Sequence, residues 1–288
     1  DPYVPLYANV ALKLIAEHAA NHPADGRVGM RCRMGEYLVA CGPESRPDMF
    51  THSNCVLSVS DHDSHSLVKS FYSRAAESTN EEILNPVSYG EENLGHIPEH
   101  MRVRSYGCGS PVLDCDLRPG RRIVDLGSGT GIECFIAAKK VGPRGRVFGI
   151  DMSDSMLCRA REALVHVEKA LGYRNVEFRK GLLEKLPLES DSLDFVISNC
   201  VVNLTPDKRG VLEEIYRVLK PGGMLCISDI VTMSEIPVDM KYNEKLRGEC
   251  LGGAMLQQEL FAMIEELGFV GTYLVRRYEY RRVRGHPF

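Results

Sequence analysis

The sequence lacks the long apolar run that a membrane-spanning helix requires. No stretch of its 288 residues approaches the roughly 18 consecutive apolar residues of such a helix. A dominant charge is also absent, since a net charge of −4 gives no argument for nucleic acid or an anionic membrane as a partner. With 44% hydrophobic and 26% charged residues, the composition is typical of a soluble globular protein. Nothing suggests an obligate oligomer, and we expect a monomer.

Two common metal-binding patterns are missing as well. None of the ten cysteines forms a CxxC pair, which excludes zinc-finger and thioredoxin spacing. The nine histidines show no HExxH spacing. A chain of this size does not need disulfides to fold, so we expect a reducing compartment, the cytoplasm. Apolar sequence surrounds several of the cysteines, and we interpret four as structural small hydrophobes: Cys115, Cys134, Cys158 and Cys226.

Three regions are distinguishable along the chain. Residues 1–63 form a leader of unknown role, with helical periodicity over 7–22 and short strands expected around Gly35. Residues 64–120 are predicted to be a helical cap, with a loop over 85–95 and a second helix near 98–105. Residues 121–288 alternate between strand and helix patterns.

This alternation predicts an α/β fold. Strands are expected at 121–127, 146–151, 175–181, 193–199, 224–230 and 272–282, and helices at 131–141, 154–171 and 206–220. Such βαβ repetition implies a Rossmann-like, doubly wound, mainly parallel sheet with helices on both faces.

The strongest local motif is D-L-G-S-G-T-G, residues 125–131, between the first strand and its helix. Its glycines allow the backbone to lie close to a ligand, and the helix that follows presents its positive end. A dinucleotide-binding motif would need glycine at the position of Ile132. This weakens the interpretation of the loop as a site for a nicotinamide cofactor. Asp151 ends the second strand, where a carboxylate can accept ribose hydroxyls, although a helix cap is the alternative.

Together with G-I-D-M and L-K-P-G-G, this motif resembles the class I S-adenosylmethionine-dependent methyltransferases over residues 120–280. The resemblance implies that the glycine loop faces the methionine end of the cofactor, Asp151 the ribose and Met152 the adenine. Implied cofactor contacts are Tyr106, Asp125, Gly127, Ser128, Gly129, Gly131, Asp151, Met152, Leu182, Leu183, Glu184 and Asn199.

Three further cysteines lie in sequence that is not typical of a buried core. Cys108 lies in Y-G-C-G, Cys200 follows the fourth strand in S-N-C-V-V-N-L, and Cys250 lies in G-E-C-L-G-G-A. Ligands of open α/β sheets bind beyond the carboxyl ends of the strands, so Cys200 and Cys250 are expected on that rim. Cys108 would approach from the helical cap.

These three phrases resemble arsenite methyltransferases, over about residues 68–282. The resemblance implies that Cys200 and Cys250 bind trivalent arsenic, and that Cys108 supplies a third thiolate or resolves a disulfide. Arsenic(III) is a soft centre that thiolates bind, and its lone pair can attack a sulfonium methyl group without a general base. The implied products are mono- and dimethylated arsenic, with arsenite or its thiol conjugates as substrate and thioredoxin or glutathione as reductant.

The chain departs from that family in two places. Family members often carry another cysteine in a T-N-G-C phrase, but the matching run here, from Ser78, has none, and no cysteine stands between Cys55 and Cys108. Family members also usually continue well past the methyltransferase fold, which this sequence does not.

Other functions remain open on the sequence. A methyltransferase of an organic small molecule would need a general base or an apolar pocket rather than three thiols. A non-catalytic metalloid-binding protein would use the thiols but not the glycine loop. A structural zinc site would need a fourth ligand besides Cys108, Cys200 and Cys250.

Overall fold

The computed structural model describes two compact units, Asp1–Asp63 and Ser64–Phe288. The residues it describes are 31–34, 37–40, 65, 68–69, 71–73, 89–102, 106–241, 243–277, 282–283 and 286–287. In the first unit, β1 (Arg31–Met34) pairs antiparallel with β2 (Tyr37–Ala40), as expected for short strands around Gly35. The helix expected over 7–22 lies outside the described residues.

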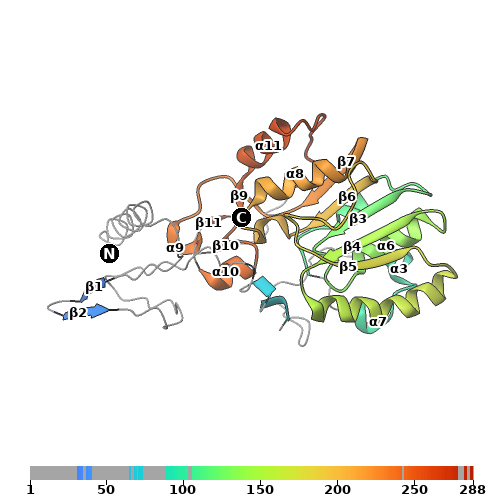
Figure 1. Cartoon of the computed structure of the whole chain (residues 1–288), viewed down its shortest axis with the longest axis horizontal. Helices are drawn as coiled ribbons and strands as arrows, with labels where there is room; N and C mark the ends of the chain where they lie inside the picture. Colours follow the sequence, from blue (N-terminus) through green and yellow to red (C-terminus); the bar gives the residue numbers. More distant parts are fainter. Residues whose placement is uncertain are drawn as a thin grey trace. The chain divides into compact units, whose positions relative to one another are not determined.

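The second unit is built on a five-stranded sheet in the order β5-β4-β3-β6-β7 (Figure 1). Its strands are β3 (Arg122–Leu126), β4 (Arg146–Asp151), β5 (Val176–Lys180), β6 (Leu193–Asn199) and β7 (Leu219–Ser228). All four neighbouring pairs are parallel. Every strand therefore ends at the same edge of the sheet, and the strand order switches direction between β3 and β6, where α/β proteins bind ligands.

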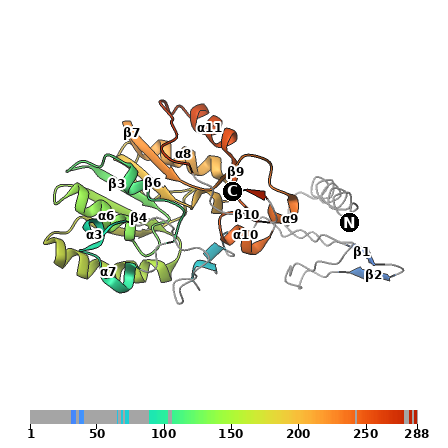
Figure 2. The same cartoon turned by 180° about the vertical axis from the view of Figure 1, so that it is seen from behind.

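Side chains alternate between the two faces of this sheet. Ile123 packs with α6 (Ile132–Val141) and α7 (Asp154–Leu171), whereas its neighbour Val124 packs with α8 (Lys208–Val218). Partly buried side chains of α11 (Gln257–Glu266) complete the second cluster. The helices thus cover both faces, as Figures 1 and 2 show, and the doubly wound parallel fold expected from the sequence is confirmed.

Local sequence explains where the longest helix begins and ends. The Ser153 side chain accepts a hydrogen bond from Met156 N, which caps α7 at its first turn. Gly172 closes the same helix in a left-handed conformation with φ 79°. The expected boundaries of this helix, 154–171, are therefore confirmed.

Several boundaries differ from the expectation. β7 begins at Leu219, because the L-K-P-G-G run already belongs to the strand, and α8 ends at Val218 rather than at 220. A short helix, α3 (Glu91–Leu94), lies inside the expected loop, and α4 (Glu99–Arg102) covers part of the expected second helix. A further short helix, α5 (Pro111–Asp114), was not expected.

The connection after β7 carries short elements at the carboxyl edge of the sheet. These are β8 (Val231–Thr232), α9 (Val238–Lys241), α10 (Glu244–Gly248) and β9 (Met255–Leu256), with β8 and β9 paired in parallel. A 3-10 turn, η3 (Val202–Leu204), follows β6.

The sixth strand expected over 272–282 is wrong over residues 272–277. Residues 272–277 form no strand, and only the short hairpin of β10 (Arg282–Val283) and β11 (His286–Pro287) follows. Tyr273 and Leu274 have the strand propensity that misled the prediction, yet they are 71% and 51% exposed. Strand propensity does not make a strand where no neighbouring strand supplies hydrogen bonds. Among the described residues, no helix has the length and apolar character to cross a membrane.

Candidate active site

A cavity opens at the carboxyl ends of β3, β4, β5 and β6 in the second unit. The glycine loop forms one wall, and the segments that follow β4 and β5 form another. It is lined by nearly all of the residues that the resemblance implied for the cofactor: Tyr106, Asp125, Gly127, Ser128, Gly129, Asp151, Met152, Leu182, Leu183, Glu184 and Asn199.

Gly131 is the exception, because it does not line the cavity. It begins α6 with φ 92°, and a Cβ placed there would lie 2.6 Å from the Phe178 ring. The glycine is required for this turn and for the close approach of Phe178. Gly131 therefore has a packing role in the structure, and its contact with the cofactor stays a prediction.

Asp151 joins the two walls of the cavity. Its Oδ2 accepts a hydrogen bond from Gly129 N at 2.9 Å, and its Oδ1 accepts one from Ser153 N at 2.8 Å. Burial raises the pKa of this carboxyl, although both hydrogen bonds favour the charged form. The N-cap of α7 is Ser153, so the alternative reading of Asp151 as the helix cap is wrong.

Two buried acids lie beneath the glycine loop. Burial, and then the charge of Glu133, raise the pKa of Asp125, which accepts a hydrogen bond from Cys134 Sγ at 3.3 Å. Glu133 accepts hydrogen bonds from Tyr89 Oη at 2.7 Å and from Val112 N at 2.9 Å. Burial raises the pKa of Glu133 to about 7. This carboxyl holds α5 and the segment before α3 against α6.

Two cavity residues carry buried polar atoms that need partners. Within the described part of the chain, Ser128 Oγ and both carboxylate oxygens of Glu184 have no hydrogen bond. The contact of Glu184 Oε1 with His65 Nε2, at 3.3 Å, is an ion pair only when the histidine is protonated. Buried polar atoms are rarely left unsatisfied, so the cavity fits a ligand that offers them polar groups.

Sequence reasoning missed much of the cavity wall. The helical cap contributes five of the residues that were missed, and the segments that follow the strands contribute the others. They are His65, Val68, Lys69, Tyr72, Gly107, Thr130, Ile132, Glu133, Ser153, Met156, Gly181, Val201, Leu204 and Thr205. The cap residues have no motif of their own, because their place in the wall depends on how the cap packs.

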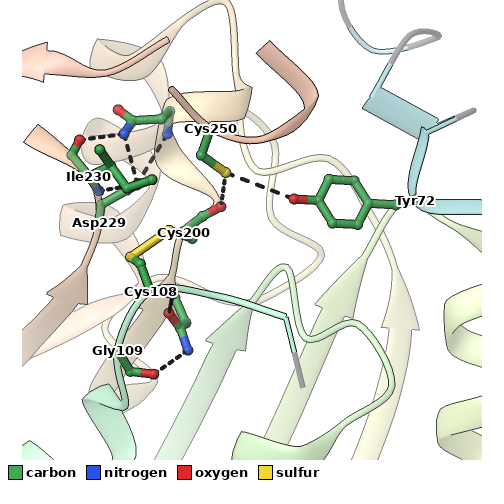
Figure 3. Close-up of a disulfide and its surroundings, with 9 residues drawn as sticks. Tyr72, Cys108, Gly109, Cys200, Asp229, Ile230 and Cys250 are labelled. Carbon is green, nitrogen blue, oxygen red and sulfur yellow. Dashed lines mark hydrogen bonds between the residues drawn. A yellow bond between two sulfur atoms is a disulfide. The ribbon is translucent and has the colours of Figure 1, made fainter. Parts of the chain in front are cut away.

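Three cysteines meet at the edge of this cavity (Figure 3). Cys108 and Cys200 form a disulfide with a Cα–Cα distance of 5.9 Å. Cys250 Sγ donates a hydrogen bond to the Cys200 carbonyl at 2.8 Å and lies 3.9 Å from Tyr72 Oη. The three cysteines that the motifs singled out, from distant parts of the chain, are thus brought together.

Asn199 holds the Cys108 loop in place. Its Oδ1 accepts a hydrogen bond from Cys108 N at 3.1 Å, and its Nδ2 donates one to the Gly109 carbonyl at 2.8 Å. Gly107 and Gly109 flank Cys108, and glycines leave the backbone free around its thiol. They also allow a close approach, since a Cβ on Gly107 would lie 2.6 Å from the Asn199 side chain and one on Gly109 2.5 Å from Ser228 Oγ.

Backbone conformation also orients two of the cysteines. Cys200 has φ 56° and Cys250 has φ 66°, both in the left-handed region that non-glycine residues rarely adopt. Cys200 N donates a hydrogen bond to the Ser228 carbonyl at 2.7 Å, which ties the turn after β6 to the end of β7. Such strained conformations are concentrated at functional sites.

The cysteines lie in an apolar cluster, contrary to the expectation of surroundings unlike a core. Cys108, Cys200 and Cys250 are 5%, 6% and 2% exposed and pack with Leu204 and Ile230, among others. Burial raises the pKa of Cys250 well above its ordinary value. Access to sulfur is therefore through the cavity, which Cys200 lines.

Of the four cysteines interpreted as structural, three lie in or against the core. Cys134 is fully buried, Cys115 is buried and Cys226 is partly buried against the same cluster. Cys158 differs from these three, because it is exposed on α7. Cys55 lies outside the described residues.

Asp229, directly after β7, is a site residue that sequence reasoning missed. Its Oδ1 accepts hydrogen bonds from Asn203 Nδ2 and Ile230 N, and its Oδ2 accepts one from Asn203 N at 3.2 Å. Burial raises its pKa to about 6. A carboxylate oxygen of Asp229 and the sulfurs of Cys108 and Cys200 all lie within 4.8 Å of one another. The sequence signal that could have identified Asp229 is its place in S-D-I, as an acid at the end of a strand.

Comparison with known proteins agrees with this architecture. A family model described as a methyltransferase domain matches residues 117–268. Arsenite methyltransferases from Mus musculus and Halobacterium salinarum are 43% and 44% identical over 193 and 186 residues, which cover 65% and 62% of this chain. These matches cover 51% and 46% of the relatives, so the chain spans about half the length of the curated proteins it matches.

A solved structure supports the same relationship. The crystal structure of an arsenic(III) S-adenosylmethionine methyltransferase from Chlamydomonas reinhardtii superimposes with a TM-score of 0.58 at 38% identity, covering 62% of this chain and 60% of that one. The sheet order, the glycine-loop cavity and the matched family model lead to one conclusion: this chain belongs to the methyltransferase-domain family.

Proposed function

We propose that this chain transfers methyl groups from S-adenosylmethionine to trivalent arsenic held by Cys108, Cys200 and Cys250. The meeting of these three thiol-bearing residues at the edge of the cofactor cavity is the observation that carries the proposal. Thiolate sulfur is the protein donor that suits soft, thiophilic arsenic(III). The similarity to arsenite methyltransferases supports the same acceptor.

The chain's own residues fit the cofactor. Gly127 and Gly129 bring backbone close to the methionine end, and Asp151 offers its carboxylate to the ribose. The unsatisfied Ser128 Oγ and Glu184 carboxylate would gain partners from the polar groups of the ligand. S-adenosylmethionine, when bound, supplies an electrophilic methyl group on its sulfonium sulfur.

The cysteines act by positioning the acceptor. Three thiolates around arsenic leave its lone pair on the open side of a pyramid, and Cys200 lines the cavity where the methyl group would arrive. Arsenic loses no proton in this reaction, so no general base is needed. The apolar surroundings formed by Leu204, Ile230 and Leu251 keep water from the reacting centre.

Reduction completes the proposed cycle. Methyl transfer takes arsenic formally from the trivalent to the pentavalent state, and two electrons from a pair of thiols return it to the trivalent state as the pair becomes a disulfide. Cys108 and Cys200 already form such a bond. We propose thioredoxin or glutathione as the thiol that restores them by exchange. The proposed products are mono- and dimethylated arsenic.

A methylation assay with a matched cysteine control tests this function. The protein is incubated with S-adenosylmethionine, arsenite and excess thiol, and the arsenic species are separated by chromatography with elemental detection. Cys250→Ser removes a proposed ligand and is expected to lower methylation at least about tenfold. Cys158→Ser changes an exposed cysteine that does not line the cavity and is expected to leave the rate unchanged.

Two results would count against the proposal. Measurable cofactor binding without any methylated arsenic would point to an organic acceptor instead. Equal loss of activity in Cys158→Ser and Cys250→Ser would show that the effect is not specific to the cysteine site.

A further inference from the structure

We infer that the reduced site also binds a thiophilic divalent cation, Zn²⁺ or Cd²⁺, through Cys108, Cys200 and Asp229. One donor atom from each of these residues lies within 4.8 Å of the others. Zinc sites use thiolate and carboxylate donors, and four-coordinate zinc places its ligands about 2.0–2.3 Å from the metal. The site shares Cys108 and Cys200 with the proposed arsenic site, but the inference does not rest on methyl transfer and requires only that the two thiols be reduced.

The two sulfurs are held together by the fold and not by their bond alone. Asn199 anchors Cys108 through two hydrogen bonds, and Cys200 N is bonded to the Ser228 carbonyl. After reduction by a phosphine and water, which yields two thiols and a phosphine oxide, these contacts remain. A divalent cation then displaces one proton from each thiol and joins the same two sulfurs.

Asp229 supplies the oxygen that a purely thiol site lacks. Its Oδ1 is occupied by two hydrogen bonds, from Asn203 Nδ2 and Ile230 N, which fix the orientation of the carboxyl group. Its Oδ2 accepts a hydrogen bond from Asn203 N, and the carboxyl group also accepts one from Val202 N. Outer contacts of this kind orient metal ligands and strengthen binding.

The donor set distinguishes a divalent cation from arsenic. Arsenic(III) is satisfied by three sulfurs, of which Cys250 is the proposed third. A tetrahedral cation accepts a hard oxygen donor and a fourth ligand, which Cys250 or water can provide. Cadmium or zinc would therefore occupy the thiols that arsenite needs, and the expected consequence is inhibition that arsenite can relieve by competition.

Cadmium titration of the reduced protein tests the site directly. Cadmium chloride is added after the phosphine has been removed, and the ultraviolet charge-transfer band of cadmium thiolate is followed. One equivalent is expected to bind. Asp229→Asn is expected to weaken cadmium binding at least about tenfold while arsenite binding changes less. The matched control Asp116→Asn alters an exposed acid and is expected to change neither.

X-ray absorption at the cadmium edge of the parent protein tests the same site without any variant. Sulfur neighbours together with an oxygen at carboxylate distance are expected. Sulfur neighbours alone, or unaltered cadmium affinity in Asp229→Asn, would overturn the assignment of Asp229. Absence of cadmium binding to reduced protein that still methylates arsenite would overturn the site and leave the proposed function intact.

Discussion

Asn199 stands where the cofactor cavity meets the cysteine site. It lines the cavity, and both polar atoms of its side chain bind the Cys108 loop. A single amide thus couples the end of β6 to a loop more than ninety residues earlier in the chain. The buried acids around the glycine loop act differently, because their contribution to stability depends on whether they are protonated.

Replacement of Asn199 by Ala is expected to loosen the Cys108 loop. Two side-chain hydrogen bonds are lost, at about 1 kcal/mol each, so the free energy of unfolding should fall by about 2 kcal/mol. Urea unfolding measures that loss, and alkylation of Cys108 in the reduced protein, followed by mass spectrometry, should become faster. An unchanged alkylation rate would mean that the backbone alone holds the loop.

Glu133 is expected to make stability depend on pH. Its pKa is raised from 4.5 to about 7 in the folded chain, so the native state binds this proton more tightly than the unfolded state does. The associated stability is complete below about pH 4.5 and is lost as pH rises through 7, by about 3 kcal/mol at most. Burial also raises the pKa values of Asp125, Asp151 and Asp229, so their contributions to stability change with pH in the same direction.

Glu133→Gln isolates that contribution, because glutamine does not titrate. Unfolding free energies from urea denaturation at several pH values should fall less steeply between about pH 5 and pH 8 in the variant than in the parent. Parallel curves for the two proteins would show that Glu133 does not carry the proton difference.

At the scale of elements, α8 supports the turn that carries Cys200. The helix buries an apolar stripe of Val211, Leu212, Ile215 and Val218, each fully buried, against the sheet. Its periodicity was recognisable in the sequence, and its first turn depends on a cap. The exposed Asp207 provides that cap by accepting a hydrogen bond from Gly210 N at 2.9 Å.

Loss of this cap should destabilise the chain without touching the site. Asp207→Ala is expected to lower the free energy of unfolding by about 1 kcal/mol, as measured by urea denaturation. Asp207→Ser keeps a capping oxygen and should recover most of the loss. If Asp207→Ser destabilises as much as Asp207→Ala, the acid contributes through its charge and not as a cap.

At the scale of the whole molecule, the two large cores belong to one unit. Both clusters that cover the sheet are formed by residues between Tyr89 and Phe269, within the unit Ser64–Phe288. All of the described residues that line the cavity belong to that unit, from His65 onward. The unit Ser64–Phe288 therefore contains both the described hydrophobic core of the sheet and the candidate active site.

A chain that begins at Ser64 is accordingly expected to fold and to bind S-adenosylmethionine with a Kd within about twofold of the parent, measured by calorimetry. A shorter chain that begins at Tyr89 also loses Val68 and Tyr72 from the cavity wall. Its Kd should rise at least about tenfold. Equal binding by the two truncated chains would show that the cap does not contribute to the cofactor site.

The sequence alone was sufficient for the α/β alternation, the glycine loop and the three cysteines. Strand and helix periodicities are local, and Ser153 and Gly172 mark the ends of α7 within a few residues of the helix they bound. The motifs around Cys108, Cys200 and Cys250 were similarly visible, because each is a short continuous phrase.

Tertiary structure alone decided what meets at the site. Tyr72 carries no motif, and Asp229 has only the weak signal of an acid at a strand end. The packing of β7 and the cap brings both residues to the cysteines. The strand expected over 272–282 does not form over residues 272–277, because pairing is a property of neighbouring segments and not of one segment alone. Local preferences for helix, strand or turn depend on adjacent residues, whereas contacts between distant segments depend on the free energy of the whole packed core.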